Sequence, residues 1–188
     1  MVDDLSRALV YIRNHIHEHH PQADPDQIFL SGHSAGAHLI SLLVLDKTHF
    51  ERHHYPRSSI RGVITMSGIY TLANPIHDSK YSPGNVVFRL LYSSNLRYPK
   101  GKTMVEYSPI EHINANDELP PFLVMSARYD MGLESNARRF VEKLRKCNHE
   151  VQYHVFGGMT THDTIVTMFT TNDARRHFFS FVRQYMKQ

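Results

Sequence analysis

The chain has 188 residues, of which 41% are hydrophobic, and its formal net charge is +3. A chain of this length and composition can form one domain with a substantial hydrophobic core. Its basic residues are scattered, with some pairs inside helical stretches, and this argues against the continuous basic stripe of a nucleic-acid-binding protein. No apolar run reaches the roughly 18 residues that a membrane-spanning helix needs.

Two features of the sequence bear on the cellular compartment of the protein. The single cysteine, Cys147, excludes an internal disulfide, which fits a reducing environment. The acidic start, Met1-Val2-Asp3-Asp4, lacks the charged and then apolar pattern of a signal peptide. We therefore expect a cytoplasmic protein.

In chain order, apolar spacing predicts alternating helices and strands. The first half contains helix 2–18, strand 27–31, helix 35–46 and strand 61–67. An irregular excursion over 68–118 follows, with an apolar patch of helical character at 86–92. The second half contains strand 121–126, helix 134–146, strand 151–156 and helix 173–186.

This alternation predicts a single α/β domain built on a parallel sheet, without internal repeats or a linker. In such sheets the chemistry lies beyond the carboxyl ends of the strands. Three loops follow predicted strand ends and carry reactive side chains, namely 32–36, 127–133 and 157–163.

The first of these loops, Gly32-His33-Ser34-Ala35-Gly36, matches G-x-S-x-G between a predicted strand and a predicted helix. A serine on such a sharp turn has its hydroxyl raised above the sheet. We expect the glycines at 32 and 36 because a Cβ at either position would clash in the tight turn. Ser34 is therefore the candidate nucleophile.

A serine nucleophile needs a histidine base, and that base needs a carboxylate to fix its tautomer. Asp130 follows the third predicted strand, and His162 follows the fourth. The order serine, acid, histidine and the loop positions agree with a hydrolase triad. We predict that Ser34, Asp130 and His162 are catalytic.

Other residues compete for these roles. Asp163 adjoins His162 but as a sequence neighbour would rarely reach its ring, while Asp78 and Asp173 do not follow strands. His38, one helical turn after the serine, is expected to pack or to line the pocket. We assign His33, beside the nucleophile, to substrate binding.

The 15 histidines also raise the question of a metal site. The two local clusters contain no H-E-x-x-H helix pattern, and the lone cysteine provides no zinc knuckle. Both clusters fall at or beyond predicted helix ends, where surface histidines are common. We expect no metal and no cofactor; the clusters are His17, His19 and His20, and His49, His53 and His54.

Longer motifs carry a family resemblance. The segment Gly32-His33-Ser34-Ala35-Gly36-Ala37-His38-Leu39 resembles the nucleophile turn of α/β-hydrolase carboxylesterases, in particular kynurenine formamidases and isoprenylcysteine methylesterases. Three further segments are similar to theirs: Met66-Ser67-Gly68-Ile69-Tyr70-Thr71-Leu72, Ser108-Pro109 and Leu119-Pro120-Pro121. The resemblance runs from about residue 2 to the C-terminus.

The resemblance implies an α/β-hydrolase fold, the triad named above and an oxyanion donor at the backbone N–H of Ala35. It implies that residues of about 70–107 cover the site, so that the excursion forms part of one partial hydrolase domain over 1–188. We assign Tyr70 to substrate binding, and the aromatics of this segment suit an apolar ester or formamide substrate: Tyr70, Tyr81, Phe88 and Tyr92.

The chain departs from this family at its start. The family carries an H-G-G loop before the nucleophile, and no H-G-G occurs here. We therefore expect the C-terminal portion of the fold, without the first strands of the sheet, and an exposed edge on strand 27–31 that favours self-association. Two hypotheses stay open: a serine hydrolase of small esters or arylformamides, and a non-catalytic or partner-dependent fragment.

Overall fold

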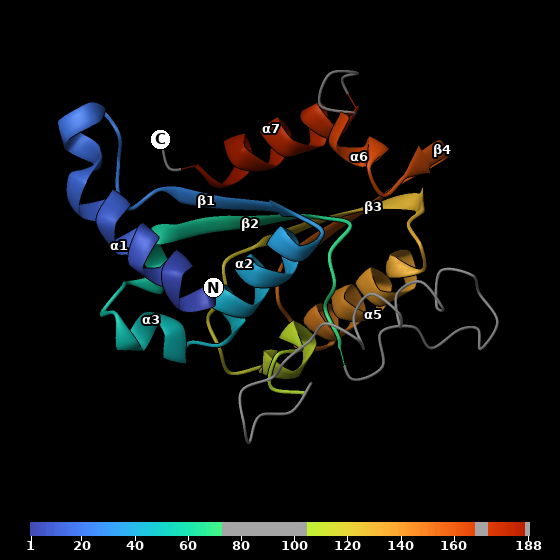
Figure 1. The fold of residues 1–188 in the computed structure, drawn as a ribbon, viewed down its shortest axis with the longest axis horizontal. Helices are drawn as coiled ribbons and strands as arrows, with labels where there is room; N and C mark the ends of the chain where they lie inside the picture. Colours follow the sequence, from blue (N-terminus) through green and yellow to red (C-terminus); the bar gives the residue numbers. More distant parts are fainter. Residues whose placement is uncertain (73–104, 168–172, 187–188) are drawn as a thin grey trace.

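The computed structural model describes residues 1–72, 105–167 and 173–186 (Figure 1). Within them, four parallel strands form one sheet in the order β1-β2-β3-β4. The strands are β1 (Ile28–His33), β2 (Ile60–Met66), β3 (Phe122–Tyr129) and β4 (Val151–Thr161).

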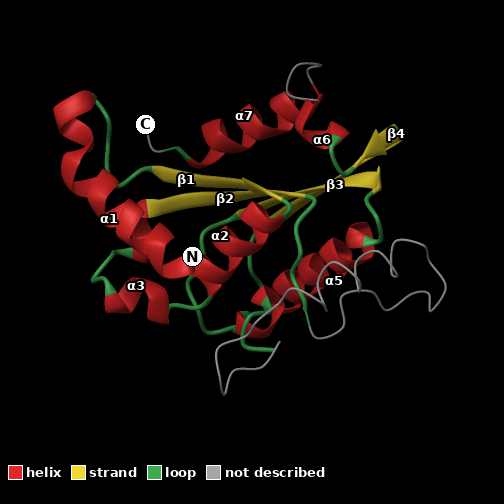
Figure 2. Ribbon diagram, viewed as in Figure 1, coloured by secondary structure: helices red, strands yellow, loops and turns green. Residues whose placement is uncertain are grey.

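Helices cover both faces of this sheet, as Figures 1 and 2 show. One face carries α1 (Val2–His19), α2 (Ala35–Leu45) and α5 (Leu133–Lys146). The other face carries α7 (Asp173–Tyr185), which packs on β2 and β3. Shorter elements connect these layers, namely α3 (Thr48–Arg52), α6 (Thr164–Thr167) and 3-10 turns at Arg57–Ser59 and Pro109–His112.

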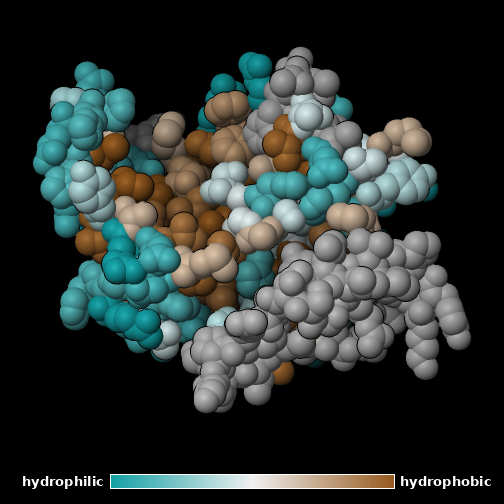
Figure 3. Space-filling model, viewed as in Figure 1, coloured by the Kyte–Doolittle hydropathy of each residue, from teal (hydrophilic) through white to brown (hydrophobic). Residues whose placement is uncertain are grey.

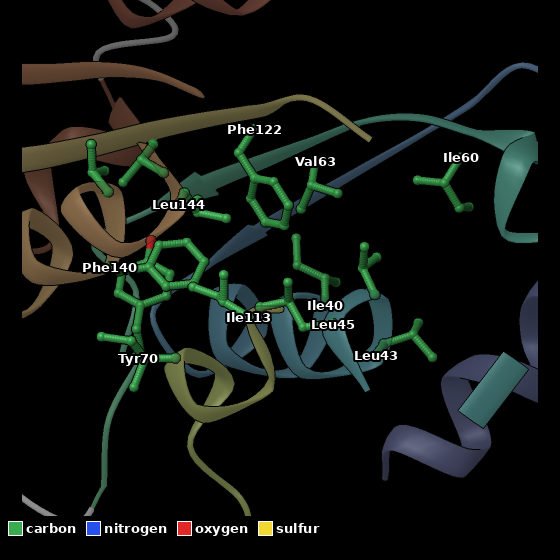
Figure 4. Packing of buried hydrophobic residues seen from close by; sticks show 14 of the residues in the cluster. Ile40, Leu43, Leu45, Ile60, Val63, Tyr70, Ile113, Phe122, Phe140 and Leu144 are labelled. Atoms are coloured by element: carbon green, nitrogen blue, oxygen red, sulfur yellow. The ribbon is translucent and has the colours of Figure 1, made fainter. Parts of the chain in front are cut away.

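The hydrophobic core follows from the two-residue period of the strands. In β3, Phe122 and Val124 point into the cluster under α2 and α5, whereas Leu123 and Met125 point into the cluster under α7. Since both faces are covered, the first six residues of β3 are buried. Figure 4 shows the larger cluster packed between the sheet and α2.

Each helix and strand predicted within the described residues is present, with ends shifted by a few residues. β3 and β4 run past their predicted ends, so the predicted loop 157–163 is largely strand. This extension comes from pairing: after a break in register, Tyr129 of β3 again faces Thr161 of β4. The predicted helical patch at 86–92 lies outside the described residues.

β1 is an edge strand, and no described residue pairs with its outer side. Its apolar residues Ile28, Phe29 and Leu30 are half-buried. Figure 3 shows brown, apolar surface in the middle of this view, between α1 and α7. Among the helices of the described residues, none combines the length and the apolar character that crossing a bilayer demands.

Candidate active site

The turn between β1 and α2 holds Ser34 in a strained conformation. Its φ is 53° and its ψ is −117°, a region that residues with a side chain seldom adopt. The Ser34 N–H donates to the Met66 carbonyl at 2.9 Å, and the Ser34 carbonyl accepts from the His38 N–H at 3.1 Å. The turn is therefore tied to β2 on one side and to α2 on the other.

The two glycines of the motif differ in what they do. A Cβ on Gly32 would lie 2.6 Å from the backbone carbon of Gly36, because the strand end and helix start approach closely there. A Cβ on Gly36 would meet nothing within 4 Å. The expected clash is thus confirmed at Gly32, and it is wrong at Gly36, which is the second residue of α2 and has open space beside it.

Asp130 follows β3 directly and is held inside the protein. Its carbonyl accepts a 2.7 Å hydrogen bond from the Leu133 N–H at the start of α5. The residue is 1% exposed. One carboxylate oxygen faces His162, and the other, Oδ2, has no hydrogen-bond partner within the described residues. A carboxylate with so little solvation is well placed to stabilise a neighbouring cation.

His162 follows β4 and lies between the other two residues. Its Nδ1 is 2.7 Å from Asp130 Oδ1, and its Nε2 is 3.0 Å from Ser34 Oγ. Since a carboxylate only accepts, Nδ1 carries the proton and Nε2 is free to accept from the serine. The three residues predicted from the sequence are therefore within hydrogen-bond reach, although the strand ends that hold them are far apart in the chain.

The competing residues lie elsewhere. Asp163 and Asp173 are exposed, and neither hydrogen-bonds to the His162 ring. Asp78 lies outside the described residues. His38 places Nδ1 2.9 Å from the Ile69 carbonyl, and burial lowers the pKa of its imidazole. His38 thus packs against the loop after β2, as expected.

His33 makes a contact that its assignment to substrate binding did not foresee. Its Nε2 donates to the main-chain carbonyl of His162 at 2.9 Å. The two imidazole rings lie with centroids 4.7 Å apart at an interplanar angle of 43°. His33 therefore contacts the loop that carries the base.

Tyr70 lies in the core, so we do not retain it as a substrate-binding residue. It is 0% exposed, and its ring stacks on Phe140 with centroids 4.1 Å apart. Its hydroxyl donates to Thr65 Oγ1 at 2.8 Å, and burial raises the pKa of that hydroxyl. Figure 4 shows Tyr70 beside Phe140 in the packed layer. The other aromatics assigned to the pocket, Tyr81, Phe88 and Tyr92, lie outside the described residues.

Ala35 is the first residue of α2, directly after Ser34. The N–H of a first helical residue has no acceptor within its helix, and it lies at the positive end of the helix dipole. Ala35 is also exposed. Its N–H is thus available beside the serine, where the resemblance implies an oxyanion donor.

Sequence reasoning missed Asn136, a buried polar residue of α5 that contacts the loop after β2. This residue is 1% exposed, and its Oδ1 accepts from the N–H groups of Tyr70 at 2.7 Å and Thr71 at 3.3 Å. These bonds hold the loop after β2. The available signal was a polar residue within the apolar stripe of α5, between Leu133 and Ala137.

The histidine clusters make separate contacts. His53 Nε2 is 2.7 Å from Asp3 Oδ1, and His49 Nε2 is 3.5 Å from Asp46 Oδ2. Within residues 1–72, 105–167 and 173–186, no group of three or more His, Cys, Asp or Glu side chains could hold a metal ion.

The parallel sheet covered by helices on both faces, with a strained serine after β1 and an Asp and a His after β3 and β4, defines the α/β-hydrolase class. Sequence comparison agrees with this class, since the model of the family described as alpha/beta hydrolase fold matches residues 1–165. The chain belongs to this family.

Two curated relatives are carboxylic ester hydrolases by name. A protein of Arabidopsis thaliana named "probable isoprenylcysteine alpha-carbonyl methylesterase" is 29% identical over 175 residues, covering 87% of this chain and 35% of that protein. A Mycobacterium tuberculosis protein named "probable carboxylic ester hydrolase" is 30% identical over 154 residues, covering 78% of this chain and 34% of that protein. The chain thus spans about a third of the length of these relatives.

Solved esterase structures share the fold. A thermophilic carboxylesterase cloned from a metagenomic library superposes with a TM-score of 0.71 at 19% identity, over 99% of this chain and 64% of that one. A bacterial heroin esterase gives a TM-score of 0.69 at 18% identity, over 99% of this chain and 60% of that one. At these identities the likeness concerns the fold alone, and it covers part of each esterase.

Proposed function

We propose that this chain carries the catalytic centre of a serine hydrolase that acts on small carboxylic esters or arylformamides. The observation that carries the proposal is the pair of contacts at His162, 2.7 Å to Asp130 and 3.0 Å to Ser34. The Ser34–His162 distance allows proton transfer, and the Asp130–His162 contact favours the tautomer that leaves Nε2 free to accept that proton. Membership in the hydrolase family supports the same reaction class.

The residues divide the reaction between them. Ser34 Oγ attacks the acyl carbon while its proton passes to His162 Nε2, and the Ala35 N–H hydrogen-bonds to the resulting oxyanion. Collapse of the tetrahedral intermediate breaks the bond to the alcohol or arylamine, which takes the proton from His162. Water then attacks the acyl-enzyme with His162 as base, the bond between Ser34 Oγ and the acyl carbon breaks, and His162 returns the proton to Ser34 as a carboxylic acid, or formic acid from a formamide, leaves.

The excursion is proposed to cover this centre as part of the same domain, over about 70–118. Its described ends meet, because the Leu72 N–H donates to Ser108 Oγ at 2.8 Å and the Ile110 N–H donates to the Tyr70 carbonyl at 2.9 Å. The Ile69 carbonyl in turn accepts from His38, one helical turn after Ser34. The described ends of the segment therefore lie together at the loop after β2, which His38 of α2 contacts.

Labelling with a fluorophosphonate tests the nucleophile. We expect one adduct, located on Ser34 by peptide mass spectrometry, and hydrolysis of p-nitrophenyl acetate or N-formylaniline. Ser34→Ala should remove both, with a loss of at least about 10³-fold in kcat. Ser31→Ala changes an exposed serine of β1, three positions before Ser34, and serves as the matched control. An unlabelled but folded wild-type protein would refute the proposal.

One observation favours a second candidate, a chain that functions only with a partner strand. Among the described residues none pairs with the outer edge of β1, and its six residues include no Lys, Arg, Asp, Glu or Pro, the residues that usually protect an edge. The half-buried apolar side chains of Ile28, Phe29 and Leu30 flank this edge. We propose a second copy of the chain as the partner, paired β1 to β1 about a two-fold axis.

Sedimentation of the purified chain separates the two candidates. Self-pairing predicts a dimer or larger species, and Ser31→Lys should shift it toward monomer by adding a charge to the edge. Ser180→Lys adds the same charge at an exposed position of α7 and should leave the proportions of monomer and dimer unchanged. A monodisperse, active monomer would exclude the partner-dependent candidate.

A further inference from the structure

His33 is the residue before the nucleophile, yet its side chain is directed to the main chain of the base. Its Nε2–H donates to the carbonyl of His162 at 2.9 Å, across 128 intervening residues. The rings of the two histidines also lie in contact, at 4.7 Å between centroids. One side chain of the nucleophile turn thus holds the histidine that must accept the nucleophile's proton.

The loop that carries His162 needs such an anchor. β4 is the edge strand at the far side of the sheet, and its register with β3 breaks between Ala127 and Tyr129. Just before His162 lie Gly158, with a φ of +68°, and Met159, which is 83% exposed. The Asp130 bond fixes the His162 side chain, whereas the His33 bond fixes its main chain.

A different histidine, His38, links the nucleophile turn to the loop after β2. His38 donates from Nδ1 to the Ile69 carbonyl at 2.9 Å and holds the loop after β2. The contacts of His33 and Ser34 join the nucleophile turn to the loop after β4: Ser34 meets the His162 ring, and His33 donates to the His162 main-chain carbonyl. The role of His33 is therefore specific to the base, whereas the role of His38 concerns the neighbouring loop.

We propose that His33 is a positioning residue for the hydrolytic reaction: by binding the His162 carbonyl it keeps Nε2 of that histidine within reach of Ser34 Oγ. This inference rests on the proposed function and replaces the assignment of His33 to substrate binding. A substrate-binding residue would set KM and depend on the ester used. Loss of a positioning residue lowers kcat for every ester alike, because the residue acts on the proton transfer that all these reactions share.

Three substitutions of His33 test this role, because they differ in whether the side chain has an N–H donor and in where that donor lies. His33→Leu removes the donor and should lower kcat, and the rate of fluorophosphonate labelling, by about 10- to 100-fold with KM nearly unchanged. His33→Gln places an amide N–H where Nε2 stands and should recover most of that loss. His33→Asn places its N–H at the shorter Nδ1 position and should not.

A spectroscopic readout keeps the test independent of turnover. The Nδ1 proton of His162, held at 2.7 Å from Asp130, should give a far-downfield NMR signal in the wild type and in Ser34→Ala. That signal should broaden or vanish in His33→Leu and persist in His33→Gln. If His33→Leu keeps the signal sharp, or alters KM with kcat unchanged, the positioning role is wrong.

The two proposals fail in different ways. Absence of labelling and hydrolysis in a folded wild type refutes the hydrolase proposal, while the NMR signal still reports whether His33 fixes His162. Wild-type labelling rates in His33→Leu refute the positioning role and leave the hydrolase proposal intact.

Discussion

Asp130 and His162 form the most enclosed polar contact of the candidate site, with 2.7 Å between Oδ1 and Nδ1 and no exposed surface on the Asp130 side chain. The Asp130 carboxylate is closed to solvent, whereas 12% of the His162 side chain is exposed. The carboxylate therefore depends on the imidazole for a hydrogen bond, and the imidazole depends on the carboxylate for its tautomer.

Asp130→Asn should expose this dependence. An asparagine can donate to Nδ1 and so favour the tautomer whose Nε2 carries the proton, which cannot accept from Ser34. We expect kcat to fall by about 10²- to 10⁴-fold while KM changes little. Steady-state kinetics on one ester measure this, and thermal unfolding of the same sample serves as the control for folding. Retention of wild-type kcat would show that Asp130 does not set the tautomer of His162.

The two motif glycines give a matched pair of substitutions. Gly32→Ala would place a methyl group 2.6 Å from backbone atoms that cannot move away, so we expect a loss of about 1–3 kcal/mol in the free energy of unfolding. Gly36→Ala meets open space and gains helix propensity, so we expect no loss and a gain of up to about 1 kcal/mol. Urea unfolding of both variants measures the difference, and equal effects would show that the turn is not as close as described.

Tyr70→Phe tests the placement of this ring in the core. Removing the hydroxyl breaks the 2.8 Å bond to Thr65 Oγ1, both residues being fully buried, and should lower the free energy of unfolding by about 1–2 kcal/mol. A double-mutant cycle with Thr65→Val isolates that bond. KM should stay at the wild-type value for any ester that the protein hydrolyses. A raised KM without loss of stability would return Tyr70 to the substrate pocket.

His38 should make the fold sensitive to acid. Burial lowers the pKa of His38 in the folded state below its ordinary value of 6.5, so the unfolded chain binds the proton first as the pH falls. The free energy of unfolding should therefore decrease below about pH 6.5. His38→Asn keeps a donor toward the Ile69 carbonyl and removes the titration.

Urea unfolding at about pH 7.5 and about pH 5.5 compares this variant with the wild type. His38→Asn should lose less stability between the two pH values than the wild type does. Burial also lowers the pKa values of His49 and His154, and these two residues contribute equally to the loss of stability in both proteins. An identical loss in wild type and variant would show that His38 does not contribute.

Local patterns were enough for the elements and for the position of the nucleophile. Ser34 lies in a strand, a turn and a helix that are contiguous in the sequence, so the motif and its flanks contain all the information needed. Gly36 shows the limit of that reasoning, since the motif marks it but only its surroundings reveal the open space beside it.

Pairings between distant segments were harder to predict. Tyr70 could be placed in the core only through Phe140 and Thr65, and the lengthened β4 only through its recovered register with β3. The unpaired edge of β1 was expected from the resemblance, but its half-buried apolar side chains became evident from the packing.

The sequence by itself determined the alternation of helices and strands and the order of serine, acid and histidine, because hydrophobic period and turn chemistry act between near neighbours. The tertiary structure alone decided that Asp130, already predicted as the acid, comes within hydrogen-bond distance of His162, and that His33 reaches the His162 carbonyl. Those choices depend on how strands that are distant in the chain lie side by side, since a hydrogen bond forms only where two atoms come within about 3 Å of each other.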